Sequence, residues 1–113
     1  MPQNSAATAL PLKPADLVLL AVLQDGPSHG YALSQAMSER SSGRVKVRPG
    51  DLYRVLYRLC EQGLVEAGGQ AGPEERRKTE YALTDRGRRI LVDEARRLAK
   101  LSAEILSHAE SAP

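Results

Sequence analysis

Residues 47–59, with the sequence VRPGDLYRVLYRL, constrain the fold of this chain more than any other stretch. Leu52, Leu56 and Leu59 recur at the i, i+4, i+7 spacing that places side chains on one face of an α-helix. The opposite face carries the charged residues Asp51, Arg54 and Arg58. A short helix with an apolar inner face and two outward arginines suits insertion into a DNA major groove. For one isolated helix of this kind, an ordinary surface helix would be the favoured interpretation.

The residues after this helix predict a β-hairpin and a final helix. Gly63 ends the first helix, and two short strands, 64–69 and 79–83, flank a Gly/Pro loop whose end carries Arg76, Arg77 and Lys78. Thr84 or Asp85 then caps a last helix that runs to about residue 107. We call the hairpin the wing. A basic helix followed by a hairpin and a helix is the element order of a winged helix-turn-helix domain.

Two further helices are expected before the basic one. Pro14 suits the first turn of the first helix, which ends at 25–27, and Ser28 is expected to cap the second, which closes at 41–43. The predicted fold class is therefore mainly α with a small β-hairpin: a winged helix-turn-helix plus a C-terminal dimerisation helix. The expected division is a disordered tail over 1–12, a DNA-binding domain over 13–85 and the dimerisation helix over 86–109.

Charge is distributed unevenly along the chain. The net charge is only +2, but residues 40–58 hold six Lys/Arg and one Asp, and residues 76–89 hold six Lys/Arg and two acids. These blocks, +5 and +4, coincide with the basic helix and with the end of the wing. A basic footprint at two such elements is what contact with DNA phosphates requires.

The last helix carries a partial heptad of apolar and small residues. Its expected dimer contacts are Leu91, Ala95, Leu98, Leu101, Ser102 and Ile105. Such a stripe is longer than a small domain can cover, so a second copy of the helix is the preferred partner. Packing within one chain is the alternative.

Several functional classes lack support in the sequence. The longest apolar run, 17–23, is far shorter than the ~20 residues that span a bilayer, and the chain start lacks the basic region of a signal peptide. One cysteine fits a reducing compartment, so a cytoplasmic location is expected, with no membrane contact. We expect no metal, because one Cys and two distant His do not form a site. No cofactor is expected and no catalytic constellation is apparent, so an enzyme is not expected.

Four ordered motifs resemble the PadR family of bacterial transcription regulators. They are GPSHGY at 26–31, PGDLY at 49–53, RLCEQGLV at 58–65 and YALTDRG at 81–87. With its single C-terminal helix, the chain is most similar to the short subfamily. The resemblance implies a dimeric repressor that releases DNA when it binds an effector, here a small molecule of unknown identity. Some short members stack flat drugs between tryptophans, but this chain has no Trp, so that site is not carried over.

Two positions depart from the family pattern. Position 51 is Asp instead of Thr or Ser; we favour a helix cap over an anion facing phosphates or an acceptor for cytosine. Position 60 is Cys instead of Glu, and a buried small hydrophobe is favoured there over a redox sensor. Tyr53 and Tyr57 are expected to pack under the basic helix with their hydroxyls toward phosphate, or entirely into the core. His29 is expected to support the start of the second helix.

The sequence thus predicts a non-enzymatic, sequence-specific regulator of double-stranded DNA. Arg54 and Arg58 are the expected groove contacts, and the full expected set is Ser28, His29, Tyr31, Arg44, Lys46, Arg48, Gly50, Asp51, Tyr53, Arg54, Tyr57, Arg58, Arg76, Arg77 and Lys78. The rival hypothesis is a winged helix that binds only proteins, which Asp51 and the modest net charge leave open.

Overall fold

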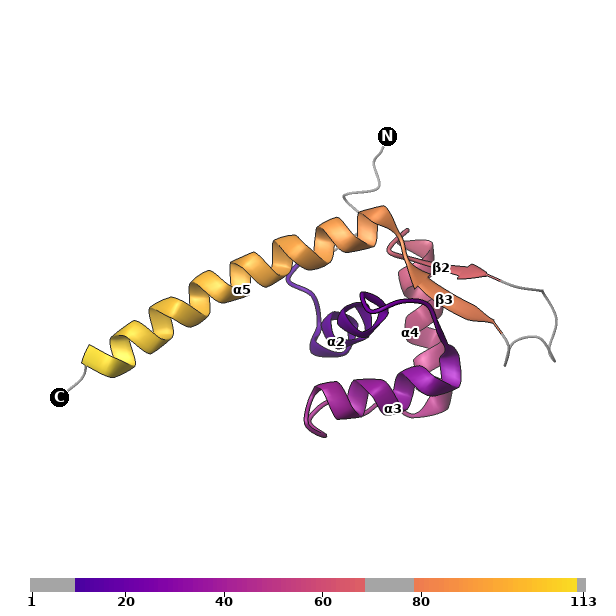
Figure 1. The fold of residues 1–113 in the computed structure, drawn as a ribbon, viewed down its shortest axis with the longest axis horizontal. Helices are drawn as coiled ribbons and strands as arrows, with labels where there is room; N and C mark the ends of the chain where they lie inside the picture. Colours follow the sequence, from indigo (N-terminus) through magenta and orange to yellow (C-terminus); the bar gives the residue numbers. More distant parts are fainter. Residues whose placement is uncertain (1–9, 69–78, 112–113) are drawn as a thin grey trace.

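The computed structural model describes residues 10–68 and 79–111. The chain order is helix α2 (Pro14–Leu23), strand β1 (Ser28–His29), helices α3 (Gly30–Arg40) and α4 (Pro49–Glu61), strands β2 (Val65–Gly68) and β3 (Glu80–Leu83), and helix α5 (Asp85–Ser111) (Figure 1). Helices therefore dominate, with one small sheet. This arrangement confirms the predicted winged helix-turn-helix fold class.

The sheet has one more strand than the sequence predicts. Its order is β1-β3-β2, with both neighbouring pairs antiparallel. Val65 pairs with Leu83 and Gly68 with Glu80, while Ser28 pairs with Tyr81 on the other side of β3. The prediction that Ser28 caps the second helix is wrong: the N-cap of α3 is His29, with no side-chain cap hydrogen bond. Residues 28–29 instead satisfy the free edge of β3, which ties the start of α3 to the wing.

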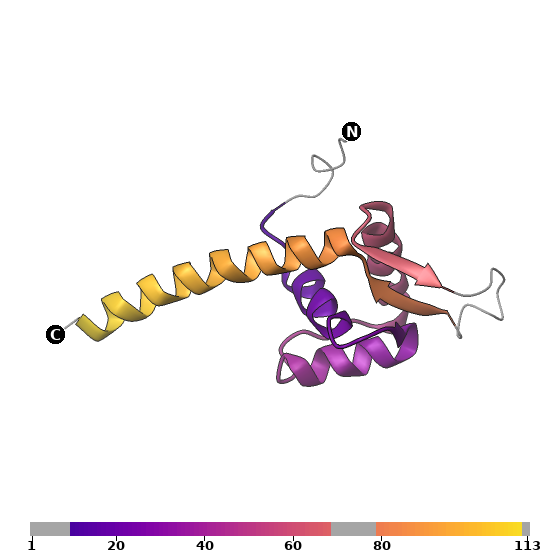
Figure 2. The same ribbon diagram turned by 45° about the horizontal axis from the view of Figure 1, so that its top comes forward.

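Leucine side chains build a core between the helices and the sheet. The inner stripe of α4, consisting of Leu52, Leu56 and Leu59, is at most 1% exposed, as the spacing predicts. Leu19 and Leu20 of α2 and Leu33 and Met37 of α3 meet it and are fully buried. Figure 2 shows α2 between α5 and α3, and α2 packs chiefly against these two helices. The core therefore fixes α4 with Asp51 and Arg54 on its exposed side.

The turn after α4 sends the chain directly into the wing. Gly63 has a φ of +77°, a left-handed conformation that favours glycine. The Leu64 N–H donates to the Leu59 carbonyl at 3.0 Å, and the Gly63 N–H donates to the Cys60 carbonyl at 3.0 Å. These bonds satisfy the last carbonyls of the helix and confirm the predicted end at Gly63.

The start of α5 is fixed to the same turn. The Thr84 hydroxyl accepts the Gly87 N–H at 2.9 Å and donates to the Gly63 carbonyl at 2.6 Å, so Thr84 is the cap of α5. A Cβ added at Gly87 would lie only 2.1 Å from the Leu64 carbonyl oxygen. The backbones of α5 and of the residue before β2 are therefore in direct contact, and only glycine fits there.

Helix α5 leaves the domain after its first turns. Leu91 is 5% exposed and packs in the core, so its own domain covers it and leaves little of its side chain for the predicted contact with a second copy. Glu94 is also buried, Ala95 is exposed and Leu98 is half-buried, and every residue from 99 to 111 is exposed. Figures 1 and 2 both show the C-terminal part of the helix projecting away from the other elements.

The N-terminal segment joins the domain before α2 begins. Leu12 is 8% exposed and its N–H donates to the Glu94 carboxylate at 2.9 Å. The rest of the predicted tail, residues 1–9, lies outside the described residues. Over 10–68 and 79–111, no helix combines the length and apolar composition needed to cross a membrane.

Candidate nucleic-acid interface

The basic helix α4 begins at an exposed proline. Pro49 occupies its first turn and Arg48 is the N-cap, with no side-chain cap hydrogen bond. The prediction that Asp51 caps the helix is therefore wrong. The N-cap lies three residues earlier, where Pro49 lacks an N–H that needs a partner. The Asp51 carboxylate instead lies 3.6 Å from the Arg54 guanidinium. Asp51 is in the first turn of the helix, where a negative charge interacts favourably with the helix dipole.

The start of α4 carries exposed basic side chains and an accessible backbone at Gly50. The Arg54 side chain is 83% exposed, which confirms its outward orientation. Arg44, Lys46 and Arg48 are exposed along the preceding loop. No atom lies within 4 Å of a Cβ added at Gly50, so the helix start is open to an approaching molecule. The predicted cations of residues 44–54 thus share one accessible end of the helix.

Arg58 differs from Arg54. Its guanidinium is not free on the outer face of the helix, because it donates to both carboxylate oxygens of Asp16 in α2, at 3.0 and 2.8 Å. The predicted groove contact of Arg58 stays a prediction. The Asp16 side chain is 6% exposed and the Arg58 side chain 38% exposed. The hydrogen bonds that Arg58 donates to Asp16 raise the pKa of Arg58 above its ordinary value. Helical spacing assigned Arg58 to the charged face but could not show that α2 supplies an anion there.

Tyrosine and histidine side chains connect α4, α3 and the wing. A Cβ at Gly30 would lie 2.8 Å from the Tyr53 ring, so the missing side chain of Gly30 makes room for a half-buried tyrosine. Tyr57 is 69% exposed, so the two tyrosines have different environments. His29 stacks on Tyr31 with ring centroids 6.1 Å apart, and its Nε2 lies 3.8 Å from the Glu80 carboxylate. Tyr31 is 68% exposed and extends the accessible face onto α3.

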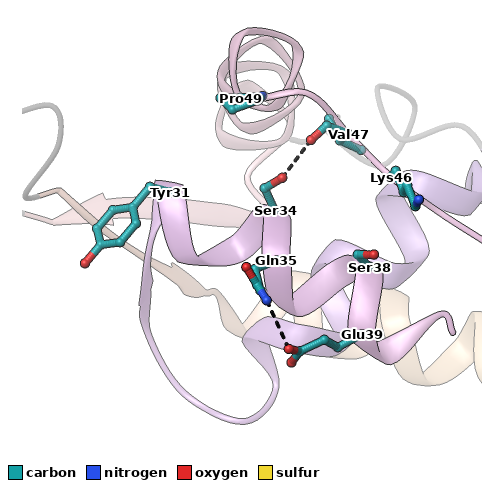
Figure 3. A pocket seen from close by; sticks show the side chains of 8 residues that line it. All are labelled: Tyr31, Ser34, Gln35, Ser38, Glu39, Lys46, Val47 and Pro49. Atoms are coloured by element: carbon teal, nitrogen blue, oxygen red, sulfur yellow. Dashed lines mark hydrogen bonds between the residues drawn. The ribbon is translucent and has the colours of Figure 1, made fainter. Parts of the chain in front are cut away.

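A polar cleft of about 360 Å³ separates α3 from the segment that leads into α4 (Figure 3). The Ser34 hydroxyl donates to the Val47 carbonyl at 2.7 Å, and the Gln35 amide donates to the Glu39 carboxylate at 3.3 Å. Figure 3 shows Tyr31 at the start of α3 with its hydroxyl pointing away from the other labelled side chains. The lining residues are Tyr31, Ser34, Gln35, Ser38, Glu39, Lys46, Val47 and Pro49. Sequence reasoning missed the serines and Gln35, because polar residues on a helix give no signal of their own.

A second pocket, of about 400 Å³, lies between α4 and the wing strands and is lined by Tyr53, Tyr57, Cys60, Ala67 and Tyr81. Burial raises the pKa of the Cys60 thiol, which keeps the less reactive protonated form at neutral pH. Within residues 10–68 and 79–111, no three His, Cys, Asp or Glu side chains gather as metal ligands would. The predicted contacts Arg76, Arg77 and Lys78 lie outside the described residues.

Comparisons with known proteins agree with this geometry. Residues 19–93 match the model of the transcriptional regulator PadR-like family. A 37.1 kDa protein in transposon Tn4556 of Streptomyces fradiae is 37% identical over 95 residues, which cover 84% of this chain and 26% of that protein. The transcriptional regulator Rv3488 of Mycobacterium tuberculosis is 34% identical over 82 residues, which cover 73% of each chain. The chain thus spans about a quarter of the first relative and most of the second.

Solved structures share the fold. A PadR-like transcriptional regulator from Bacillus cereus superimposes with a TM-score of 0.70 at 20% identity, covering 86% of this chain and 92% of the other. At that level of identity the likeness concerns the fold. It places the helices, the wing and the projecting last helix of this chain in a known architecture.

Proposed function

This chain belongs to the PadR-like family of transcriptional regulators, and we propose that it binds double-stranded DNA in a sequence-specific manner as a homodimer. The observation that carries the proposal is the open basic end of α4. Arg54 is 83% exposed there, Gly50 leaves the backbone bare, and three more cations lie on the adjoining loop. An arginine at the exposed start of a helix can reach guanine edges in the major groove.

The neighbouring residues support a role in positioning that helix. Arg44, Lys46 and Arg48 would contact phosphates on one side of the groove, together with the exposed hydroxyl of Tyr31. Ser28 and His29 would act through the backbone at the start of α3, since both are only half-exposed. Tyr57 would reach the DNA from α4, whereas Tyr53 holds α3 against α4. Arg76, Arg77 and Lys78 would follow the adjacent backbone or minor groove.

The projecting part of α5 supports dimerisation. Leu101 is 45% exposed and Ile105 is 58% exposed, with Ala95, Leu98 and Ser102 near the same stripe. Exposed leucine and isoleucine side chains at this spacing favour burial against a second helix. We therefore keep the division into a DNA-binding unit over 13–85 and a dimerisation helix over 86–109. The first turns of α5 anchor that helix to its own domain.

Repression is the direction we propose, with release of DNA by a small-molecule effector beside the α5 seam. The family resemblance supports both, and the small residues Ala95, Ala99 and Ser102 would leave room between two helices. A regulator that binds chromosomal DNA would act in the cytoplasm. A winged helix that binds only proteins is the alternative, and an experiment on duplex binding separates the two.

The test begins with in vitro selection of bound duplexes, followed by affinity measurements over a range of salt concentrations. For the wild-type protein, log K should fall with log salt by about 0.9 for each phosphate contacted. Replacing Arg76, Arg77 and Lys78 by Ala should flatten that slope and leave the sequence preference intact. No selected duplex, or binding that does not respond to salt, would favour the protein-binding alternative.

A matched control removes the same charge elsewhere. Arg89, Arg96 and Lys100 are exposed on the face of α5 opposite the proposed seam, and their replacement by Ala also removes three positive charges. This control should keep the wild-type slope. If log K falls with log salt at the same slope in the two triple variants, the wing does not contact DNA phosphates.

A further inference from the structure

The Asp16–Arg58 pair is a costly way to join two helices. Asp16 is 4% exposed. Removing a carboxylate from water costs free energy, and the attraction within an ion pair often offsets that cost only narrowly. Both oxygens of Asp16 accept hydrogen bonds from Arg58, so the guanidinium is held in one plane. Apolar side chains of similar size often replace a buried ion pair without loss of stability. The two hydrogen bonds between Arg58 and Asp16 therefore contribute more to the orientation of α4 than to the free energy of unfolding.

That orientation concerns the helix proposed to read DNA. Arg58 lies in the last turn of α4, one turn after Arg54. Packing of α4 is mainly against α3 and β2, whereas α2 packs mainly against α3 and α5. A directional bond from α2 to the end of α4 thus adds a constraint on the rotation of α4 about its axis. Rotation is the motion that would move Arg54 relative to base edges.

The segment just before α2 is also bound to α5. Four residues before Asp16, the Leu12 N–H donates to Glu94 of α5 at 2.9 Å. Glu94 is 1% exposed and also accepts hydrogen bonds from Arg97 at 2.8 and 2.9 Å. A small opening of about 180 Å³ is lined by Pro11, Leu12, Lys13, Asp16, Arg58 and Gln62, so the N-terminal segment, α2 and α4 meet at one place.

We propose that Asp16 is a positioning residue for DNA recognition, which sets the rotation of α4 through Arg58 and links α4 to α5 through the Leu12–Glu94 hydrogen bond. The inference rests on the proposed DNA-binding function and adds a residue that touches no DNA. It also gives Arg58 a role different from that of Arg54. A shift of α5 would reach α4 through the first turn of α2.

The first test compares selected and random duplexes. Asp16→Asn and Arg58→Lys should each lower the preference for the selected duplex by about ten-fold, while the salt slope stays that of the wild type. The slope is informative because Arg58→Lys keeps the charge. If Arg58 were a groove contact held back by Asp16, Asp16→Asn would free it and tighten binding. Tighter binding, an unchanged preference or a flattened slope would each overturn the proposal.

A double variant separates positioning from folding. Asp16→Leu with Arg58→Met replaces the ion pair by apolar side chains and should melt at or above the wild-type temperature. It should still lose the preference for the selected duplex by about ten-fold, because an apolar contact is not directional. A double variant with wild-type preference would show that the pair only holds the helices together. If it fails to fold, the two single variants decide.

Arg40→Lys is the matched control. Arg40 of α3 is paired with Asp25, two residues after α2 ends, and the two side chains are 46% and 69% exposed. The same substitution at this pair, which lies outside the α5–α2–α4 connection, should keep the wild-type preference. An equal loss in Arg40→Lys would show that any surface ion pair on α2 has the same effect.

A measurement on the protein without DNA tests the connection between α5 and α4 even if no duplex binds. Amide hydrogen exchange in α4 should rise several-fold in both Glu94→Gln and Asp16→Asn and stay at the wild-type level in Arg40→Lys. Failure of wild-type duplex binding together with coupled exchange would reject the proposed function but keep the helix connection. If Glu94→Gln leaves amide hydrogen exchange in α4 at the wild-type level, the connection from α5 to α4 does not exist.

Discussion

Gly87 is the residue at which α5 meets both strands of the wing, through Leu64 before β2 and Leu83 of β3. A Cβ there would lie 2.1 Å from the Leu64 carbonyl oxygen and 2.9 Å from a Leu83 methyl group. We expect Gly87→Ala to lower the free energy of unfolding by about 1–3 kcal/mol, because backbone and not a flexible side chain must move. Gly50→Ala is the control, since no atom lies within 4 Å of the added Cβ and alanine favours a helix. Equal stability of the two variants in chemical denaturation would contradict the close approach.

Glu94 gives the stability of the domain a dependence on pH. The hydrogen bonds from Arg97 and from the Leu12 N–H hold the pKa of this buried carboxyl below its ordinary value, although burial itself opposes the shift. A lowered folded-state pKa stabilises the fold above the unfolded value of about 4.3, and this contribution is lost as the pH falls through the folded value. Denaturant titrations from pH 7 to pH 3 should therefore show a steeper acid loss in the wild type than in Glu94→Gln. Parallel curves would mean that another carboxyl controls acid stability.

At the scale of the element, the proposed function gives α4 both a residue that reads DNA, Arg54, and a residue that positions the helix, Arg58. Arg54→Ala should relax the preference at one base pair and weaken binding to the selected duplex by about 1–3 kcal/mol. The melting temperature should hardly change, because the side chain is 83% exposed and its pair with Asp51 is a surface one. Arg44→Ala, from the exposed loop, should weaken all duplexes alike. If Arg54→Ala also weakens all duplexes alike, Arg54 contacts phosphate only.

At the scale of the whole molecule, the projecting helix α5 is the element through which we propose that two chains associate. Leu101→Glu should produce folded monomers, because Leu101 is 45% exposed in one chain but would bury an unpaired charge in a seam. Operator binding should be lost, since two α4 helices must reach successive major grooves about 34 Å apart. Sedimentation and melting curves measure both effects. Ala103→Glu, exposed on the other side of α5, should remain a dimer; a Leu101→Glu dimer that binds DNA would contradict the seam.

The sequence by itself determined the features that depend on neighbours along the chain. The spacing of Leu52, Leu56 and Leu59 predicted α4 and its buried stripe, and Gly63 predicted its end. The motif around Thr84 and Gly87 marked the junction that the backbone contact explains. Helical periodicity and turn conformations are local properties, so the pattern of one segment suffices for them.

Only the tertiary structure decided what depends on distant segments. Arg58 and Arg54 are equivalent on a helical wheel, but α2 places the carboxylate of Asp16 beside one of them. Leu91 belongs to the same heptad stripe as Leu101, but the domain covers the first and leaves the second exposed. The sequence around Ser28 is typical of a helix cap, but in the structure Ser28 pairs with Tyr81 at the edge of β3. In each case the deciding partner lies tens of residues away, and periodicity carries no information about which surfaces meet.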